Sequence, residues 1–361
     1  PDYDLFHPSF TSFWEDEPVR FSDKRNTFLG FRDFSVFKQS VWVDPYFRKI
    51  QETVDQALPG KANLFHHWNY DETRFIIASS DDRSYTSYYL LDVTKGSFTL
   101  LGNQKPWIKD TDCSRELTLR LSLRDGTRAL CYLRVPPGIQ NPRQLPLIVR
   151  MPNSPYMRWW WANDDLSQLL ASQGYAVLKI QPRGQPGFGR AYFEEGFDPE
   201  LTTIRQDIQD IVSALIRKEI ADPDKICLLG ENWGGFYSLL AMADSPDQYQ
   251  AAVFIDPLTD VAFYFKDGER FRRGAERYNF FQEIRQLTDK RNDPFALDPI
   301  LDTIKSPVLL LTQKEANESH IHAKSLNNVL RKRGVSSEWV KNRSSWHDYD
   351  EGRLLKRRDR K

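Results

Sequence analysis

Short apolar segments that alternate with helical patterns constrain the fold of this chain more than any other feature. They begin after the turn sequence Pro136-Pro137-Gly138, at residues 147–150, 176–180, 226–229, 252–255 and 308–311. Between them, apolar residues recur at helical spacing over 204–216 and 326–330. Strands of this apolar density are typical of a mainly parallel sheet buried on both faces. The sequence therefore predicts a doubly wound α/β domain over residues 138–361.

The first part of the chain has a different rhythm. Segments 75–80, 88–93 and 97–101 are apolar or aromatic and are separated by short polar turns. Leucines alternate with polar residues from Leu117 to Leu123, before an Asp125-Gly126 turn. Such patterns indicate antiparallel strands joined by hairpins. We therefore expect a separate β-rich segment over residues 1–137.

Charge and hydropathy exclude several classes of function. The 361 residues contain 50 Lys and Arg and 50 Asp and Glu, so the formal net charge is zero. A neutral chain has no overall field that attracts nucleic acid or an anionic membrane. No uninterrupted apolar run reaches the roughly 18 residues that a membrane-spanning helix needs. We expect a soluble protein with no nucleic-acid partner and no membrane span.

The three cysteines are sparse, and they lack the CxxC spacing of metal or redox motifs. Cys113, Cys131 and Cys227 therefore predict neither a disulfide framework nor a zinc site. A reducing, cytoplasmic compartment fits this set slightly better than an oxidising one. The chain opens on Pro1 without the pattern of a signal peptide, and the sequence does not otherwise identify a compartment.

The segment from Lys225 to Phe236 carries the chemistry. It reads as a strand, then Gly230-Glu-Asn-Trp-Gly-Gly235, then a helix. This is the layout of a nucleophile elbow, G-x-S-x-G, in which small residues permit a strained turn that presents the central side chain. The central residue here is Asn232, whose amide has no ionisable hydroxyl. A plain structural interpretation also applies, because Asn tolerates left-handed backbone geometry.

These motifs resemble the catalytic domain of the prolyl oligopeptidase family, serine peptidases with an α/β-hydrolase domain behind a β-propeller. The likeness is closest to acylaminoacyl-peptidase and dipeptidyl-peptidase branches. The matching stretches are Leu145–Val149, Gly174–Leu178, Arg183–Tyr192, Asp207–Asp210, Ile220–Lys225, Gly230–Gly235 and Asp298–Ile300. Residues 68–75 and 88–96 resemble propeller-blade repeats. Because a blade takes about 40 to 45 residues, the resemblance implies an incomplete propeller of two or three blade remnants.

The resemblance also assigns a catalytic triad. The family serine falls on Asn232 and the family histidine on His347. The family aspartate falls in the loop after strand 308–311, on Glu315, with Ala316 as the alternative. The oxyanion region maps to Trp233, which follows the nucleophile position, and to Asn153 and Ser154. The family implies no cofactor and no metal for this reaction.

Other residues offer alternative roles. Ser154 and Ser238 are the nearest candidates for a substitute nucleophile. His320 and His322, with Glu315 and Glu318, form a weak candidate metal cluster for which a solvated loop is the simpler interpretation. The aromatic run Trp159–Trp161 is either core or a recognition surface.

Two hypotheses of function follow from the residues and the resemblance. The first is a pseudoenzyme: a catalytically deficient homologue that acts as a binding or scaffolding subunit and holds a peptide-like ligand. The alternative is a serine-type hydrolase that acts on short peptides or esters with residual or altered activity. A protein partner or an oligomer is expected to cover the open β edges of an incomplete propeller.

Overall fold

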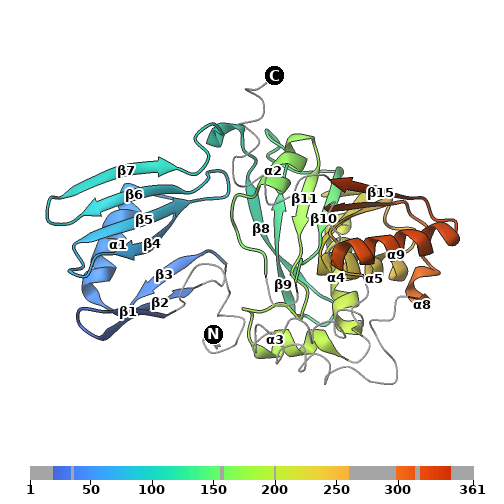
Figure 1. Cartoon of the computed structure of the whole chain (residues 1–361), viewed down its shortest axis with the longest axis horizontal. Coiled ribbons are helices and arrows are strands. Elements are labelled where there is room, and N and C mark those ends of the chain that lie inside the picture. Colours follow the sequence, from blue (N-terminus) through green and yellow to red (C-terminus); the bar gives the residue numbers. More distant parts are fainter. Residues whose placement is uncertain are drawn as a thin grey trace.

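A computed structural model describes residues 19–33, 36–154, 158–198, 201–259, 298–313 and 318–342. Within these ranges the strands form three sheets, of three, four and eight strands. The two smaller sheets lie together at one end of the molecule, and the large sheet with its helices forms the other end (Figure 1). This is the predicted architecture, an α/β-hydrolase domain beside an N-terminal antiparallel β-rich region.

The eight-stranded sheet is mixed but mostly parallel. Its strands are β8 (Glu116–Ser122), β9 (Arg128–Arg134), β10 (Leu145–Arg150), β11 (Ala176–Lys179), β12 (Ala221–Glu231), β13 (Ala251–Ile255), β14 (Val308–Gln313) and β15 (Ser337–Asn342). Their order is β15-β14-β13-β12-β10-β11-β9-β8, and β9 alone runs antiparallel to both neighbours. Because β10 lies between β11 and β12, the order of the strands reverses there, and in open α/β sheets ligands bind at the carboxyl ends of the strands at such a switch point.

β8 and β9 precede residue 138 and nevertheless belong to the large sheet. The alternating leucines of the sequence explain why: Leu121 is buried against the hydrolase core while its neighbours face outward. The first part of the chain therefore contributes strands to all three sheets. The division into domains at residues 137 and 138 stays a prediction.

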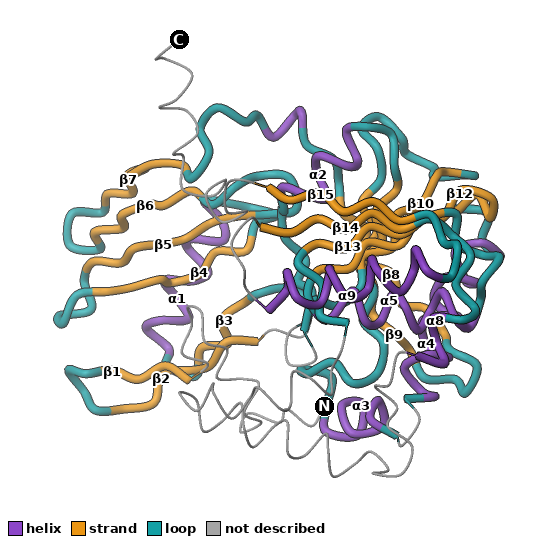
Figure 2. The backbone as a smooth tube through the Cα atoms, turned by 45° about the vertical axis from the view of Figure 1, so that its right-hand side comes forward, coloured by secondary structure: helices purple, strands orange, loops and turns teal. Residues whose placement is uncertain are grey.

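Helices flank the large sheet, and α3 (Arg190–Glu194) lies beyond the ends of its strands (Figure 2). They are α2 (Asp165–Ser172), α3, α4 (Thr202–Arg217), α5 (Trp233–Asp244), α8 (Asp298–Leu301) and α9 (Glu318–Lys332), with short 3-10 turns at Asp110–Asp112 and Glu195–Phe197. α4 and α5 pack on each other and on β12, α9 packs on β14 and β15, and α2 packs on β9 and β11. α5 is apolar all round, and ten of its residues are buried, so it is a core helix.

The β-rich region holds two antiparallel sheets. One consists of β1 (Val19–Ser22), β2 (Thr27–Asp33) and β3 (Gln39–Trp42); the other consists of β4 (Ala62–Trp68), β5 (Arg74–Ser80), β6 (Ser87–Asp92) and β7 (Ser97–Asn103) in sequential order. A four-stranded antiparallel meander is the form of one propeller blade. An aromatic cluster of Trp42, Phe47, Phe65 and Phe75 lies between the two sheets, with ring centroids 5.0 to 6.1 Å apart.

The β-rich region also contains a helix, which was not predicted from the sequence. Helix α1 (Pro45–Ala57) follows β3. Asp44 caps its N-terminus by accepting hydrogen bonds from the N–H groups of Tyr46 and Phe47, both at 3.0 Å, and Pro45 begins the first turn. Phe47, Ile50 and Val54 recur at helical spacing and are buried in the aromatic cluster. This helical signal was present in the sequence.

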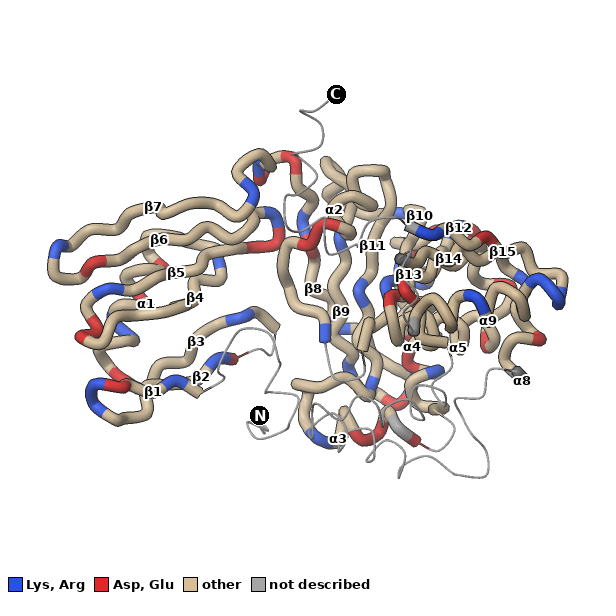
Figure 3. The backbone as a smooth tube through the Cα atoms, viewed as in Figure 1, with Lys and Arg blue, Asp and Glu red and all other residues tan. Residues whose placement is uncertain are grey.

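Charge is distributed evenly over the described residues. Lys and Arg alternate with Asp and Glu on both the β-rich region and the hydrolase domain (Figure 3). The described ranges include no helix with the length and apolar character required to cross a membrane.

Candidate active site

The elbow predicted around Asn232 is present in the structure. β12 ends at Glu231 and α5 begins at Trp233, so Asn232 alone makes the turn from strand to helix. Its backbone dihedrals are φ 49° and ψ −114°, a strained conformation for a residue with a side chain, and the residue is exposed. The fold therefore presents the Asn232 side chain at the tip of a strained strand-to-helix turn, the layout of a nucleophile elbow.

Glycines make this turn possible. A Cβ atom on Gly230 would overlap the backbone of Gly234 and Gly235, where α5 passes over the end of β12. A Cβ atom on Gly235 would lie 2.9 Å from Cβ of Pro257, in the loop after β13. The spacing of small residues in the sequence thus reflects two close approaches, of Gly230 to the backbone of α5 and of Gly235 to the ring of Pro257.

Backbone hydrogen bonds hold the elbow in place. The N–H of Asn232 donates to the carbonyl oxygen of Ile255 at 3.1 Å, at the end of the neighbouring strand β13. The carbonyl oxygen of Asn232 accepts from the N–H groups of Gly235 at 3.0 Å and Leu258 at 2.9 Å. The strained residue is therefore fixed by its neighbours on both sides.

The predicted oxyanion region lies beside the elbow, and it is already engaged. The N–H of Trp233, the donor that follows the nucleophile position, donates to the carbonyl oxygen of Asn153 at 3.3 Å. In an acyl-transfer enzyme this donor is directed at the oxygen that becomes negative in the transition state. The structure thus brings Trp233 and Asn153 into direct contact with each other.

A cluster of three charged side chains, which was not predicted from the sequence, adjoins the elbow. Arg150, at the end of β10, lies 2.5 Å from Glu231 at the end of β12 and 2.6 Å from Asp164. Burial opposes ionisation of Asp164, but the charges of Arg150, Lys179 and Arg134 outweigh it and hold the pKa of that carboxyl well below its usual range. Arginine and lysine at the ends of apolar strands, Arg150 and Lys179, were the signal that could have revealed this cluster.

Neither candidate substitute nucleophile is placed for attack. Ser154 is 6% exposed and Ser238 is fully buried, where its hydroxyl donates to the carbonyl oxygen of Gly234 at 2.7 Å. The cysteines are free, but burial raises the pKa of Cys131 to about 12 and that of Cys227 to about 11. Both thiols therefore stay protonated at neutral pH.

Other predicted site residues fall outside the described ranges. These are Glu315, its alternative Ala316, and His347, so their positions relative to Asn232 stay predictions. His322 is 3% exposed, and the ring of His320 packs on Trp339 at 4.7 Å between centroids. Among the described residues, no group of three His, Cys, Asp or Glu is arranged to hold a metal ion.

The model of the prolyl oligopeptidase family matches residues 161–360, more than half of the chain. The curated relatives include dipeptidyl aminopeptidase BIII from Pseudoxanthomonas mexicana, 24% identical over 219 residues, which are 59% of this chain and 32% of the relative. The acylamino-acid-releasing enzyme of Sus scrofa is 27% identical over 122 residues, 33% of this chain and 16% of that enzyme.

Solved structures share the fold. A puromycin-hydrolysing peptidase from Mycobacterium tuberculosis superposes with a TM-score of 0.65 at 18% identity, covering 90% of this chain and 49% of that one. An acylaminoacyl peptidase from Pyrococcus horikoshii gives a TM-score of 0.60 at 18% identity, covering 75% of this chain and 43% of that one.

The strand order, the elbow and the family match define one class. This chain belongs to the prolyl oligopeptidase family. It spans about a third of the length of the dipeptidyl aminopeptidase and less than half of either solved structure.

Proposed function

We propose that this chain is a catalytically deficient member of its family, a binding or scaffolding protein that holds a peptide-like ligand beside the elbow. One observation carries the proposal: the backbone has the strained strand-to-helix turn that is typical of a nucleophile elbow, and the side chain at its tip is the amide of Asn232. A carboxamide cannot form an acyl-enzyme with the aid of a histidine. The engaged N–H of Trp233 removes a second element of the reaction.

A fluorophosphonate probe with intact-mass detection tests this proposal. We expect no adduct on the wild-type protein, and peptide or ester hydrolysis at least about 10⁴-fold slower than that of an active family member, because loss of a triad residue costs that much. An adduct on any serine of the wild-type protein would refute catalytic deficiency and favour the alternative, a serine-type hydrolase with altered activity.

The Asn232→Ser variant is the matched arm of the same experiment. An adduct on residue 232 of this variant alone would show that a histidine and an oxyanion donor are still assembled and that one residue silences the site. Absence of an adduct in both proteins would mean that more than one catalytic element is missing from the site. It would favour a binding function over a catalytic one.

We infer further that a protein partner or an oligomer covers open β edges. β7 ends the four-stranded sheet, and within the described ranges it pairs only with β6. Its Leu100 and Leu101 are 50% and 55% exposed, and residues 97–104 carry no charge. Uncharged apolar edges of this kind are usually covered in native proteins. A purified chain that remains monomeric by light scattering up to about 100 μM, where weak β-edge pairing is detectable, would argue against a homo-oligomer.

A further inference from the structure

Six charged side chains connect the elbow to the four-stranded sheet. Three are acidic and three are basic, and consecutive members are ion-paired. In spatial order they are Glu231, Arg150, Asp164, Lys179, Glu116 and Arg134. We call this set the relay. Its members come from β8, β9, β10, β11, β12 and the residue before α2, so it crosses five neighbouring strands.

The elbow end of the relay is short and direct. The guanidinium of Arg150 contacts Glu231 with one nitrogen and Asp164 with the other, at 2.5 and 2.6 Å. Glu231 is the residue before the strained Asn232. Only the side chain of Glu231 therefore separates Arg150 from the backbone of the elbow.

The centre of the relay is removed from water. The side chains of Glu116 and Arg134 have no exposed surface, and that of Lys179 is 3% exposed. Glu116 lies 2.8 Å from the ammonium of Lys179 and 3.2 Å from the guanidinium of Arg134. Lys179 also donates to the carbonyl oxygen of Trp160 at 3.1 Å, in the aromatic run singled out from the sequence.

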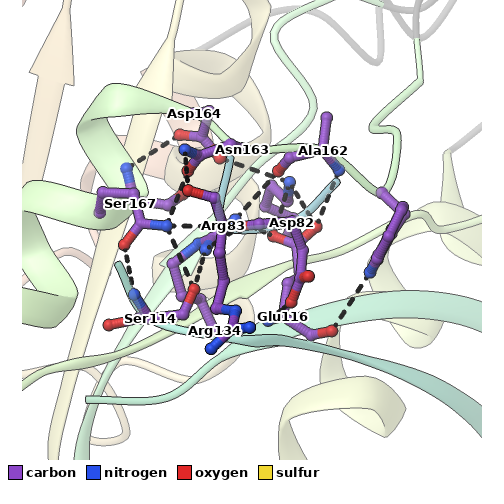
Figure 4. Close-up of polar contacts among 12 residues, drawn as sticks. Asp82, Arg83, Ser114, Glu116, Arg134, Ala162, Asn163, Asp164 and Ser167 are labelled. Carbon is purple, nitrogen blue, oxygen red and sulfur yellow. Dashed lines mark hydrogen bonds and ion pairs between the residues drawn. The ribbon is translucent and has the colours of Figure 1, made fainter. Parts of the chain in front are cut away.

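At the far end of the relay, Arg134 and Glu116 form hydrogen bonds with the loop between β5 and β6, residues 81–86 (Figure 4). Arg134 donates to the carbonyl oxygen of Asp82 at 2.8 Å, and the carboxylate of Asp82 accepts from the N–H of Glu116 at 2.6 Å. Asn163 donates to the carbonyl oxygen of Arg83 at 2.9 Å. Tyr85 hydrogen-bonds to Asp165, the first residue of α2. The loop is thus bound at several points to residues beside the relay.

Buried charges make this arrangement sensitive to displacement. A buried ion is stabilised only while its partners keep good geometry, because water does not reach it to replace them. If the β5–β6 loop moves, Arg134 and Glu116 each lose a contact, and the remaining pairs must rearrange. We propose that the relay couples the seating of the four-stranded sheet on the hydrolase domain to the conformation of the elbow. The coupling does not depend on what the elbow binds.

Hydrogen exchange measured by mass spectrometry tests the coupling. In the Asp82→Ala variant we expect exchange at least about threefold faster in peptides covering 228–236 and 158–168, because local openings propagate through linked contacts. Arg74→Ala is the matched control, since Arg74 pairs with Asp92 inside the four-stranded sheet, is 57% exposed and does not touch the relay. We expect it to leave residues 228–236 unchanged.

Two outcomes would overturn the proposal. One is faster exchange confined to residues 74–92 and 114–118, with 228–236 as in wild type. The other is equal acceleration in α9 at the far end of the sheet, which would mean general destabilisation.

Because coupling is reciprocal, Arg150→Met should speed exchange in residues 81–86, and a lack of effect there would also count against the relay. If Asp82→Ala does not fold, Tyr85→Phe, which removes a hydrogen bond from the same loop to Asp165, provides the comparison.

Discussion

Asp164→Asn is expected to lower the free energy of unfolding at neutral pH by about 3 kcal/mol, as measured by urea denaturation, because it removes one of the two carboxylate partners from each of two buried cations. Asp164 lies 2.6 Å from Arg150 and 3.4 Å from Lys179, and both basic side chains are buried. Asparagine keeps the N-cap of α2, where Asp164 accepts from the N–H of Ser167 at 2.8 Å. The substitution therefore isolates the charge from the cap.

The effect of Asp164→Asn on the free energy of unfolding should depend on pH. The pKa of Asp164 is held below its usual range in the folded protein, so the unfolded chain binds a proton first as the pH falls. The stability contributed by the carboxylate is present above the pKa of the unfolded chain, about 4, and is lost as the pH falls through the folded pKa. The difference between wild type and Asp164→Asn should thus be largest above about pH 5 and should shrink below about pH 4.

A surface pair provides the control for this prediction. Asp247 and Lys305 are 2.9 Å apart, and their side chains are 83% and 65% exposed. Asp247→Asn should change the free energy of unfolding by less than about 0.5 kcal/mol, because exposed pairs contribute little. Equal effects of the two substitutions, or a difference that does not vary with pH, would contradict the role assigned to Asp164.

Gly230→Ala is expected to destabilise the protein by about 3 kcal/mol or more. The new methyl group would clash with backbone atoms, which cannot move aside as a flexible side chain can. The ideal Cβ position overlaps the carbonyl group of Gly234 and the nitrogen of Gly235. Relief requires that α5 shift away from β12, and α5 is almost wholly buried. Thermal and urea unfolding measure the loss.

Gly102→Ala is the matched substitution. Gly102 lies in β7, and a Cβ atom there meets nothing within 4 Å. Its effect on the free energy of unfolding should stay within about 0.5 kcal/mol. If Gly230→Ala were as mild as Gly102→Ala, the close approach of α5 to β12 would not be what glycine serves at the elbow.

Much of the fold was predictable because burial leaves a pattern in the sequence. The central stretches of strands buried on both faces, such as residues 147–149 of β10 and 226–229 of β12, are apolar, and α4 shows its buried stripe at helical spacing. α1 was not predicted, although Asp44, Pro45 and the spacing of Phe47, Ile50 and Val54 are signals of a helix. The membership of β8 and β9 in the large sheet was not predictable, since alternating strands can pair in either sheet.

One part of the candidate site was also predictable from the sequence, and another part was not. The elbow was predictable because close backbone approaches demand glycine at fixed spacing around Asn232. The contact between Trp233 and Asn153 was not, because a backbone hydrogen bond between distant segments has no side-chain signature.

The sequence by itself determined the class of fold, the position of the elbow and the replacement of a hydroxyl by an amide at its tip. These are properties of residue types at short spacing, which local geometry and burial dictate. Only the tertiary structure decided that Glu231, Arg150 and Asp164 form consecutive ion pairs, and that Arg134 and Glu116 continue them to the β5–β6 loop. Residues 82, 116 and 231 are far apart in the chain, and the order of the strands in the sheet brings their charges into one network. The reason is that the interaction between two charges depends on their distance in space and not on their separation in sequence.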